Sequence, residues 1–433
     1  FLACLLQATW STHGTGKPSR RPGWAVKRPL TRSVGLRHNM TEHAQGPSRG
    51  VDAVRHARHL RLDEIGQQGQ AALGASSVAV VGAGGLGSPV LLYLAAAGVG
   101  RLTVIDDDVV NLSNLQRQVI YRTQDVGRPK AEVACERLLD LDPNVDVVVH
   151  VERLNPDNAL SLLAGHDLVV DGTDLIPARY LIDDACALLG VPWIHASVHR
   201  FEGRLAYFEP EAGPSYRDLH PEPPPPGSVQ ACDEVGVLGA VPGVLGTMQA
   251  ALSVEVLLGR IEPARGRLTL VDVQSMDTRH LRFHRLEGRM SPTNLSNARA
   301  LWQADPACNL GRQLEETDAA TASQMFHQID SAAFLQRRAD GWNPFVLDVR
   351  SSQEYASMAA HSCNIIVPHA QVLDVMADLP ESGDILIHCK SGMRSMMAAM
   401  ALMEAGIDGS RLYNLVDGIV GWYAQAPEDI RVG

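Results

Sequence analysis

One cysteine stands in a setting that is suited to chemistry. The stretch "IHCKSGMRSMMAAMALMEA" (387–405) places Cys389 on a short glycine-containing loop between an apolar strand and a long apolar helix. Backbone N–H groups and the positive end of the helix dipole can converge on the sulfur there and stabilise a thiolate. Arg394 adds a positive charge to the same loop. Such a loop can hold either a phosphate group or a persulfide.

The length of this loop favours the persulfide. Four residues separate Cys389 from Arg394, one fewer than in phosphatases that use a Cys-to-Arg loop. The smaller ring fits a sulfur atom better than a tetrahedral phosphate. We therefore predict that Cys389 carries the reactive sulfur and that Arg394 assists it.

A second chemical feature lies far upstream. In "VAVVGAGGLGSPV", Gly82, Gly84 and Gly87 have GxGxxG spacing between a β-rich run and a helical pattern. Glycines allow the backbone to turn sharply and approach a phosphate, which then lies at the helix N-terminus. Asp106, at the end of the next strand, is placed to accept hydrogen bonds from a ribose. Alone, the pattern indicates ATP or a dinucleotide such as NAD, or a tight turn without a ligand.

Charged residues further along the chain favour ATP. The segments "SNLQRQ" (113–118) and "GRPKAE" (127–132) bring Arg117 and Lys130 close in sequence to the phosphate end of the site. "DGTD" places Asp174 just beyond a buried strand, where open α/β sheets hold their reacting groups. Two cations and a carboxylate that can hold Mg²⁺ suit a triphosphate better than a diphosphate. Each residue alone would be a solvated surface charge, but the ordered set predicts ATP.

These motifs occur together in a known family. The series "GAGGLGSP", "AAAGVGRLTVIDDD", "SNLQRQ", "VGRPKAE", "DGTD" and "ARYLIDDA" resembles the MoeB/ThiF family of ubiquitin-activating-like adenylyltransferases over residues 55 to about 285. The resemblance implies that ATP and the C-terminal glycine of a ubiquitin-like sulfur carrier form an acyl-adenylate and pyrophosphate. It assigns Mg²⁺ to Asp174. The predicted nucleotide-binding set is Gly82, Gly84, Gly85, Gly87, Asp106, Ser113, Asn114, Leu115, Gln116, Arg117, Lys130 and Asp174.

The resemblance also has implications for assembly and for metal content. "RHARHLRLDEIG" matches the family's N-terminal motif, so Arg58 would reach the phosphates, in this family from the other subunit of a homodimer. Leu175 departs from the Asn that usually follows the Asp, which leaves one ATP contact in question. The two cysteine pairs of the family's structural zinc align with neutral or acidic residues: Ser215, Asp218, Asn294 and Asn297. Since Ser and Asn cannot replace thiolates on Zn²⁺, we predict no zinc site.

The C-terminal part of the chain resembles a different family. "HCKSGMRS", "VLDVRSSQEY" (346–355) and "NLVDGIVGW" (414–422) together resemble the rhodanese domain, whereas "HSCNIIVPHA" between them departs from the family pattern. We interpret Asp348 and Arg350 as an ion pair that positions the end of a strand.

The other cysteines divide into one candidate and several structural residues. Cys232, in "VQACDEVGVLG" after a proline run, resembles a cysteine of fused relatives that captures the acyl group or resolves an acyl disulfide; an ordinary loop cysteine is the alternative. Cys135 and Cys186 fall in helical patterns and are expected to be inert, and Cys363 to be structural. Cys308 falls in a predicted linker, so we expect it to be exposed, with a resolving role left open.

The sequence predicts two unlike α/β domains on a tether. Strand–helix alternation from 75 to 190 indicates a mainly parallel, Rossmann-like sheet, which half-buried strands extend from 194 to 208. The predicted domains are an adenylyltransferase (40–287), a linker (288–324) and a small α/β rhodanese domain (325–433). Residues 1–39 are basic and lack acidic residues; they are either a targeting segment or an over-extension before Met40, and we leave them out of the fold.

Composition narrows the partners and the compartment. A net charge of −11 argues against nucleic acid and anionic membranes. Seven cysteines without a CxxC pair indicate a reducing cytosol rather than a disulfide framework. The chain has no run of 18 apolar residues, so no transmembrane helix is predicted.

One reaction needs both domains. Adenylation gives a carboxylate a leaving group, and a Cys389 persulfide, loaded by a cysteine desulfurase or another donor, supplies the sulfur for a thiocarboxylate. We therefore predict an adenylyltransferase–sulfurtransferase resembling the MoeZ-type fusion, serving molybdopterin or related sulfur-containing biosynthesis. Two alternatives are an NAD-binding redox protein with a persulfide sensor domain, and a degenerate scaffold that binds a sulfur carrier without activating it.

Overall fold

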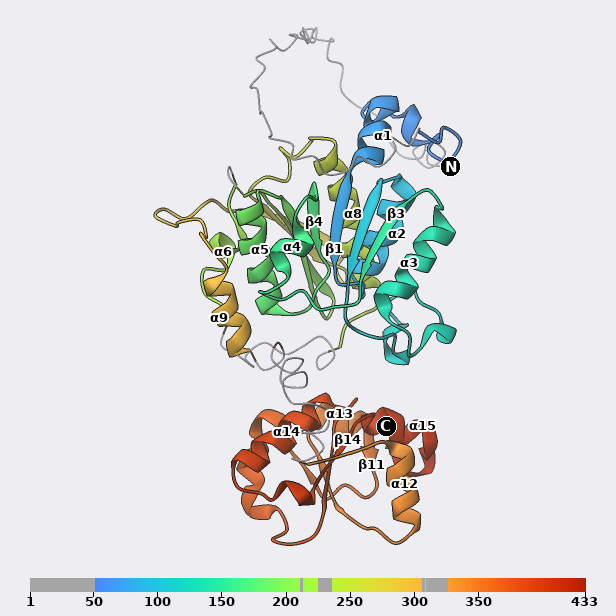
Figure 1. The fold of residues 1–433 in the computed structure, drawn as a ribbon, viewed down its shortest axis with the longest axis vertical. Helices are drawn as coiled ribbons and strands as arrows, with labels where there is room; N and C mark the ends of the chain where they lie inside the picture. Colours follow the sequence, from blue (N-terminus) through green and yellow to red (C-terminus); the bar gives the residue numbers. More distant parts are fainter. Residues whose placement is uncertain (1–50, 211–212, 225–235, 306–307, 309–325) are drawn as a thin grey trace, which may run out of the picture. The chain divides into compact units, whose positions relative to one another are not determined.

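The computed structural model describes residues 51–210, 213–224, 236–305, 308 and 326–433. Its larger sheet has eight strands in the order β3-β2-β1-β4-β5-β6-β7-β8. Strands β3, β1 and β4 are labelled in Figure 1. The strands are β1 (Ser77–Val81), β2 (Arg101–Ile105), β3 (Asp146–His150), β4 (Leu168–Asp171), β5 (Trp193–His199), β6 (Glu202–Phe208), β7 (Arg267–Asp272) and β8 (Asp277–Arg282). Strands β1 to β5 pair in parallel and β5 to β8 antiparallel. The predicted mainly parallel α/β fold is confirmed.

Alternation along the central strand explains the layers. Val78 and Val80 of β1 lie in one apolar core, and Ala79 and Val81 in the other. Helices α2, α3 and α8 cover the first face, and α4, α5 and α9 the second. The helical segments of this part are η1 (His59–Arg61), α1 (Gly66–Ala75), α2 (Gly87–Ala97), η2 (Leu112–Asn114), η3 (Thr123–Asp125), α3 (Lys130–Leu141), α4 (Ala159–Leu163), α5 (Ile176–Leu189), α6 (Tyr216–Leu219), α8 (Ala240–Leu257) and α9 (Ser296–Ala304).

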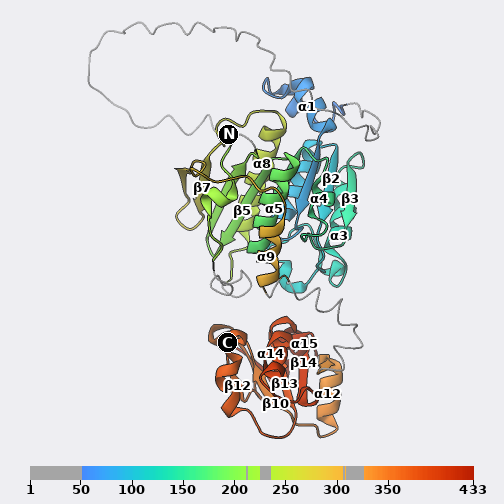
Figure 2. The same ribbon diagram turned by 60° about the vertical axis from the view of Figure 1, so that its left-hand side comes forward.

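Helix α8 is apolar over its whole length because it lies on the sheet. Of the helices in the described part of the chain, it is the one that is long and apolar enough to pass a test for a membrane span. It packs along α2 and across β5 and β6; Figure 2 shows α8 beside β5. Val241, Leu245 and Ala250 of this helix are buried in the first core. These contacts are those of a helix in the core of a globular domain.

The predicted linker begins with a packed helix. Helix α9 places Ala298 and Trp302 in the second core, against α5. Cys308 is buried in the same cluster, with 4% of its surface exposed, so the expectation that it is exposed was wrong. Burial raises the pKa of its thiol to about 12, which leaves it protonated at neutral pH and unsuited to a resolving role.

The C-terminal part contains a five-stranded parallel sheet in the order β12-β10-β13-β14-β9 and a two-stranded pair, β11 and β15. Its strands are β9 (His327–Ile329), β10 (Phe345–Asp348), β11 (Met358–Ala360), β12 (Ile365–Ile366), β13 (Ile385–His388), β14 (Leu412–Leu415) and β15 (Ile430–Val432). Its helical segments are α12 (Ser331–Ala339), α13 (Ser352–Ser357), η4 (His369–Asp378), α14 (Met393–Glu404), η5 (Gly409–Arg411), α15 (Gly418–Gln425) and η6 (Pro427–Asp429). Helix α14 covers one face of the sheet, and α12 and α15 cover the other.

Candidate functional site

The glycine loop connects β1 to α2 and folds tightly on itself. Gly82 has a φ of +92°, which favours glycine. A Cβ atom on Gly82 would lie 2.8 Å from the carbonyl oxygen of Gly172, and one on Gly87 would lie 1.9 Å from the carbonyl oxygen of Gly82. No side chain fits at these two positions, so the loop backbone stays bare at the N-terminus of α2, where an anion can approach.

The "SNLQRQ" segment lies directly over this loop. A Cβ atom on Gly85 would lie 3.4 Å from Cγ of Arg117, and one on Gly84 would lie 3.6 Å from Nε2 of Gln118. Arg117 donates a long hydrogen bond (3.4 Å) to the carbonyl oxygen of Ser113. The predicted segment and the predicted loop therefore meet in space. Gln118 is a buried neighbour of the loop that sequence reasoning missed.

The remaining residues of that segment hold its shape. Asn114 accepts a hydrogen bond from the Asn111 backbone at 3.1 Å. Leu115 packs on the first core. Gln116 packs against Gly239, where a Cβ atom would come within 2.2 Å of its carbonyl oxygen. Their side chains or backbones are engaged in fixing the turn that carries Arg117.

Asp106 and Lys130 also lie beside the glycine loop. Oδ2 of Asp106 accepts a hydrogen bond from the Ala83 backbone at 2.7 Å, so the carboxylate is tied to the glycine loop. Burial raises the pKa of Asp106, although nearby Lys130 and two backbone N–H groups act against that rise. Lys130, at the start of α3, is 5% exposed and pairs with Asp108. Within the chain as folded, the Lys130 charge is thus matched by Asp108.

Asp174 is exposed and follows the end of β4 closely. A Cβ atom on Gly172 would lie 2.7 Å from the carbonyl oxygen of Gly82, so the strand end abuts the glycine loop and Asp174 comes two residues later. A solvent-facing carboxylate at this position could bind Mg²⁺ through oxygen. Leu175 instead packs on the second core, which shows that the position after Asp174 faces inward.

A buried polar network behind Asp174 was missed by sequence reasoning. Asp171, at the end of β4, accepts hydrogen bonds from Thr173 (2.9 Å from the backbone and 2.7 Å from the hydroxyl) and pairs with His195 of β5 at 2.8 Å. Arg179 of α5 donates to the Thr173 carbonyl oxygen at 3.2 Å. These contacts hold the turn that presents Asp174. The sequence did contain a signal for this network: Asp171 and His195 interrupt otherwise apolar strands.

Arg58 does not reach the glycine loop within its own chain. It is exposed and directly precedes η1. His56, two residues before it, packs against Gly98, just past the C-terminal end of α2. The glycine loop is at the other end of that helix, about 16 Å away at 1.5 Å per residue. The structure thus assembles the other predicted ATP residues but not this one.

At the positions aligned with the zinc cysteines, side chains form an ion pair and hydrogen bonds within the protein. Asp218, whose side chain is fully buried, pairs with Arg289 at 2.6 Å and accepts hydrogen bonds from the backbones of Leu286 and Ser215. Asn294 accepts a hydrogen bond from the Ser296 backbone. In the described residues no group of three or more His, Cys, Asp or Glu side chains could hold a metal ion. Asp218 and Asn294 thus have other partners, and the absence of zinc stays a prediction.

Cys389 lies at the end of β13 in a loop that surrounds its sulfur. The side chain is 1% exposed. Sγ accepts hydrogen bonds from the Gly392 backbone at 3.2 Å and from the Ser395 hydroxyl at 3.5 Å. Gly392 has a φ of +90°, and its N–H is at the start of α14. The predicted convergence of a backbone donor and a helix N-terminus on the sulfur is therefore present, with Ser395 as an additional donor that sequence reasoning missed.

Arg394 forms an ion pair with Glu354. Its Nη1 and Nη2 donate to Glu354 of α13 at 2.9 and 2.8 Å. Burial by itself would raise the pKa of Glu354, but hydrogen bonds from Arg394 and Ser351 outweigh it and lower the pKa. Glu354 is therefore ionised at neutral pH, and the predicted positive charge of the loop is neutralised by a partner that sequence reasoning missed.

The other two motifs of the rhodanese resemblance also have defined contacts. The backbones of Ile419 and Val420 in α15 donate to the carbonyl oxygens of Cys389 and Lys390 at 2.9 and 3.3 Å, so "NLVDGIVGW" fixes the loop. The predicted ion pair of Asp348 and Arg350 is confirmed, with both side chains buried and Nη2 lying 2.5 Å from Oδ2.

Three other cysteines within the described residues have the environment of structural thiols. Cys186 is buried, and burial raises the pKa values of Cys135, Cys186 and Cys363, to about 11 for Cys363. All three fit the predicted inert role. Cys232 lies outside the described residues, so its predicted part in the reaction stays a prediction.

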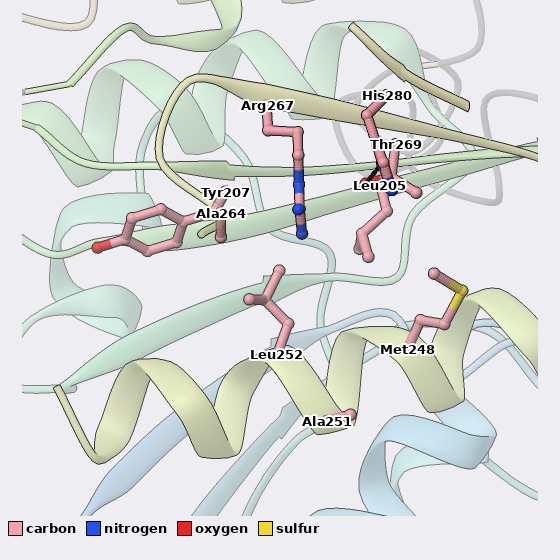
Figure 3. A pocket seen from close by; sticks show the side chains of 9 residues that line it. All are labelled: Leu205, Tyr207, Met248, Ala251, Leu252, Ala264, Arg267, Thr269 and His280. Carbon is pink, nitrogen blue, oxygen red and sulfur yellow. Dashed lines mark hydrogen bonds between the residues drawn. The ribbon is translucent and has the colours of Figure 1, made fainter. Parts of the chain in front are cut away.

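A pocket of about 230 Å³ lies away from the predicted chemistry. It opens between α8 and the antiparallel strands, with Arg267 reaching from β7 toward Leu252 of α8, and His280 bonded to Thr269 (Figure 3). None of the predicted site residues lines it. The candidate site is instead the open surface above the glycine loop.

Comparison with known proteins agrees with this geometry. Residues 56–291 match the model of the ThiF family. The chain belongs to the ThiF family. Residues 331–425 match the rhodanese-like domain, so the two predicted resemblances are both confirmed.

Curated relatives share the two-domain arrangement. The probable adenylyltransferase/sulfurtransferase MoeZ of Mycobacterium tuberculosis is 36% identical over 399 residues, covering 90% of this chain and 97% of the relative. The adenylyltransferase and sulfurtransferase MOCS3-1 of Zea mays is 33% identical, covering 90% and 86%. A sulfur carrier protein adenylyltransferase of Thermus thermophilus is 48% identical over 236 residues, covering 53% and 87%. This ThiF-family protein is an enzyme of the adenylyltransferase and sulfurtransferase class.

Proposed function

We propose that the protein adenylates the C-terminal glycine of a ubiquitin-like sulfur carrier ending in Gly-Gly and converts the adenylate to a thiocarboxylate. One observation carries the proposal: a bare glycine loop walled by Asp106 and Arg117 occurs in the same chain as the Cys389 sulfur loop. Relatives named for both activities align with 90% of the chain.

In the adenylation step, the carrier carboxylate attacks the α-phosphate of ATP, and pyrophosphate leaves. The glycine loop and the N-terminus of α2 bind phosphate oxygens, and Asp106 accepts hydrogen bonds from the ribose. Arg117 balances the charge of the departing pyrophosphate, together with Lys130, which then exchanges its partner Asp108 for a phosphate oxygen. Asp174 would hold Mg²⁺, which supplies further charge neutralisation when bound.

In the sulfur step, the persulfide of Cys389 attacks the acyl carbon and AMP leaves, which gives an acyl disulfide. A second thiolate then attacks the Cys389 sulfur of that disulfide. The carrier leaves as a thiocarboxylate, and a disulfide forms between the two enzyme cysteines. Cys232 is our candidate for the second thiol. No net oxidant is required, because the persulfide sulfur arrives at the correct oxidation level, and cellular thiols reduce the enzyme disulfide afterwards.

We further propose a homodimer in which Arg58 of one copy completes the site of the other. The position of Arg58, at the far end of α2 from the glycine loop, supports this arrangement. So do four exposed apolar side chains on the segment beside the site, which a partner surface would cover: Val109, Leu112, Val119 and Val126.

We also propose that the protein works in the cytosol and holds no structural zinc. The five cysteines within the described residues are free thiols, which suits a reducing compartment. The ion pair between buried Asp218 and partly buried Arg289 occupies one of the aligned positions, which supports a site without zinc.

The decisive experiment is ATP–pyrophosphate exchange by the full chain with a panel of carriers ending in Gly-Gly, repeated with Asp174→Ala. We expect carrier-dependent exchange in the wild type and its loss in the variant. Folded protein that exchanges with no carrier would favour the non-catalytic scaffold. Bound NAD, or a change in nicotinamide absorbance, would favour the redox alternative.

Mixing two inactive variants tests the homodimer. Arg58→Ala and Asp174→Ala should each lose exchange, whereas an equimolar mixture that has re-equilibrated should recover about a quarter of wild-type activity, because half of the dimers are mixed and each has one complete site. No recovery in a mixture shown to exchange subunits would contradict the shared site.

A further inference from the structure

We infer that Glu354 determines which sulfur donor loads Cys389, by cancelling the charge of Arg394 so that the loop accepts persulfides in preference to anionic thiosulfate. The inference rests on the proposed role of Cys389 as the sulfur-transferring residue. It concerns the donor, and is independent of the carrier and of ATP.

The first observation is the geometry of the pair. Arg394 and Glu354 make two parallel hydrogen bonds of 2.8 and 2.9 Å, the bidentate arrangement that gives the strongest charge-assisted contacts. Their side chains are 13% and 14% exposed, so solvent weakens the pair less than it would on an open surface. The guanidinium is therefore held against α13.

The second observation is that Glu354 is held in place before any donor arrives. It is the third residue of α13, and its Oε2 accepts hydrogen bonds from the backbone and the hydroxyl of Ser351, both at 3.1 Å. The Ser351 hydroxyl in turn accepts from the Glu354 backbone at 3.3 Å. This reciprocal cap holds the Glu354 carboxylate in the position where it binds Arg394.

The third observation is which groups contact the sulfur. The hydrogen bonds found for Sγ of Cys389 come from the Gly392 N–H and the Ser395 hydroxyl, which are both uncharged. Arg394 lies between these two donors in the sequence, but its charge is paired with Glu354. The donor therefore approaches a loop whose arginine charge is balanced by the charge of Glu354.

Donor charge decides which substrate such a loop accepts. Thiosulfate carries two negative charges and needs cationic groups beside the reactive cysteine. A persulfide needs only hydrogen-bond donors for its terminal sulfur. In the persulfide reaction, the Cys389 thiolate attacks the outer sulfur of R–S–SH. A new S–S bond forms, the S–S bond of the donor breaks, and R–S⁻ leaves with that electron pair. The products are the Cys389 persulfide and the donor thiol.

The test replaces Glu354 by its neutral isostere and compares two donors. Sulfur transfer by the full chain is measured with thiosulfate and with the persulfide of 2-mercaptoethanol, using cyanide as acceptor. We expect Glu354→Gln to lower the KM for thiosulfate by about threefold to tenfold, because Arg394 regains its field, with little change in kcat or in the KM for the persulfide. Glu404→Gln is the matched control, since it removes the same charge from the exposed C-terminal end of α14.

A double variant separates charge from structure. Because Glu354→Gln also weakens the cap of α13, its effect is measured again with Arg394 replaced by Gln. The gain for thiosulfate should disappear in the double variant, whereas a purely structural effect would persist. A thiosulfate KM within twofold of wild type in Glu354→Gln, or an equal change for both donors, would overturn the inference.

Intact mass after incubation with the persulfide distinguishes this outcome from failure of the proposed function. The full chain should gain the mass of one sulfur atom, and Cys389→Ser should gain none. If the wild type acquires sulfur from neither donor, the sulfur step of the proposed function fails, and the donor inference fails with it.

Discussion

Individual hydrogen bonds decide how the Cys389 sulfur is held. The Ser395 hydroxyl, which is fully buried, lies 3.5 Å from Sγ and 3.0 Å from the Gly392 carbonyl oxygen. A hydroxyl has one proton to donate, so it can stabilise either acceptor at a given moment. When the sulfur becomes anionic, we expect the proton to turn toward it, since hydrogen bonds to charged acceptors are the stronger ones.

At this scale we predict the effect of removing that hydroxyl. Ser395→Ala should slow formation of the Cys389 persulfide by about fivefold, which corresponds to the roughly 1 kcal/mol of a net hydrogen bond. The rate is measured by intact mass against time with a persulfide donor. Ser391→Ala, in the same loop but exposed, should stay within twofold of wild type. Equal rates in all three proteins would show that the hydroxyl does not act on the sulfur.

Short elements at the edge of the adenylation sheet are joined by buried polar contacts. Arg217 of α6 pairs with Asp184 of α5 through bonds of 2.8 and 2.7 Å, and Asp218 of α6 pairs with Arg289. Helix α6 has only four residues and would not be stable alone. The ion pairs therefore attach it to α5 and to the segment that follows β8.

Breaking the ion pair between Asp218 and Arg289 should be costly without involving a metal. Asp218→Asn should lower the free energy of unfolding by about 3 kcal/mol, because it leaves Arg289 partly buried without its charge partner. Asp157→Asn, in the exposed pair with Arg299, should change it by only about 0–1 kcal/mol. Both are measured by urea unfolding. The interpretation of Asp218 and Arg289 as a metal-free ion pair would be contradicted if the wild type contained about one zinc per chain and lost stability when EDTA was added.

Helix α9 supplies a second prediction at the scale of elements. Trp302 is 5% exposed and packs in the second core, so Trp302→Ala should lower the free energy of unfolding by about 3–5 kcal/mol. Asn297→Ala, on the exposed side of the same helix, should change it by less than about 0.5 kcal/mol. Urea unfolding curves with the same small loss for both variants would show that α9 is not part of the domain core.

The molecule as a whole contains several histidines that burial keeps neutral. Burial lowers the pKa of His56, His166, His195 and His388, and lowers that of His220 to about 4. In an unfolded chain these groups titrate near 6.5. Between pH 6.5 and 4 the unfolded state therefore binds more protons than the folded state, and stability must fall as the pH falls through this window.

We predict a corresponding pH dependence of unfolding. The urea midpoint should change little from pH 8 to 7 and should decrease steadily from pH 6.5 toward 4. His220→Gln should reduce the slope of stability against pH in that range by up to about one bound proton. Unfolding curves at half-unit pH intervals measure the slope. An unchanged slope in the variant would mean that His220 titrates equally in both states.

The sequence alone determined the fold class and the two family resemblances, and it predicted two reacting centres. Apolar runs such as "SSVAVVG" and the glycines after them have local causes: a buried parallel strand must be apolar, and only glycine tolerates the turn at Gly82. The spacing from Cys389 to Arg394 is also set within one short stretch of the chain. Patterns of this kind can be recognised without knowing which residues meet across the fold.

Only the tertiary structure decided which partners these residues have. Glu354 lies forty residues before Arg394, and Asp108 lies twenty-two before Lys130, so no short pattern could reveal either pair. The only local signal at Glu354 was its capping position after Ser351. The same limit explains why Cys308 was expected to be exposed, because polar neighbours in sequence do not show that a helix packs on a distant core. Ion pairs and burial depend on distance in space, which sequence separation does not determine.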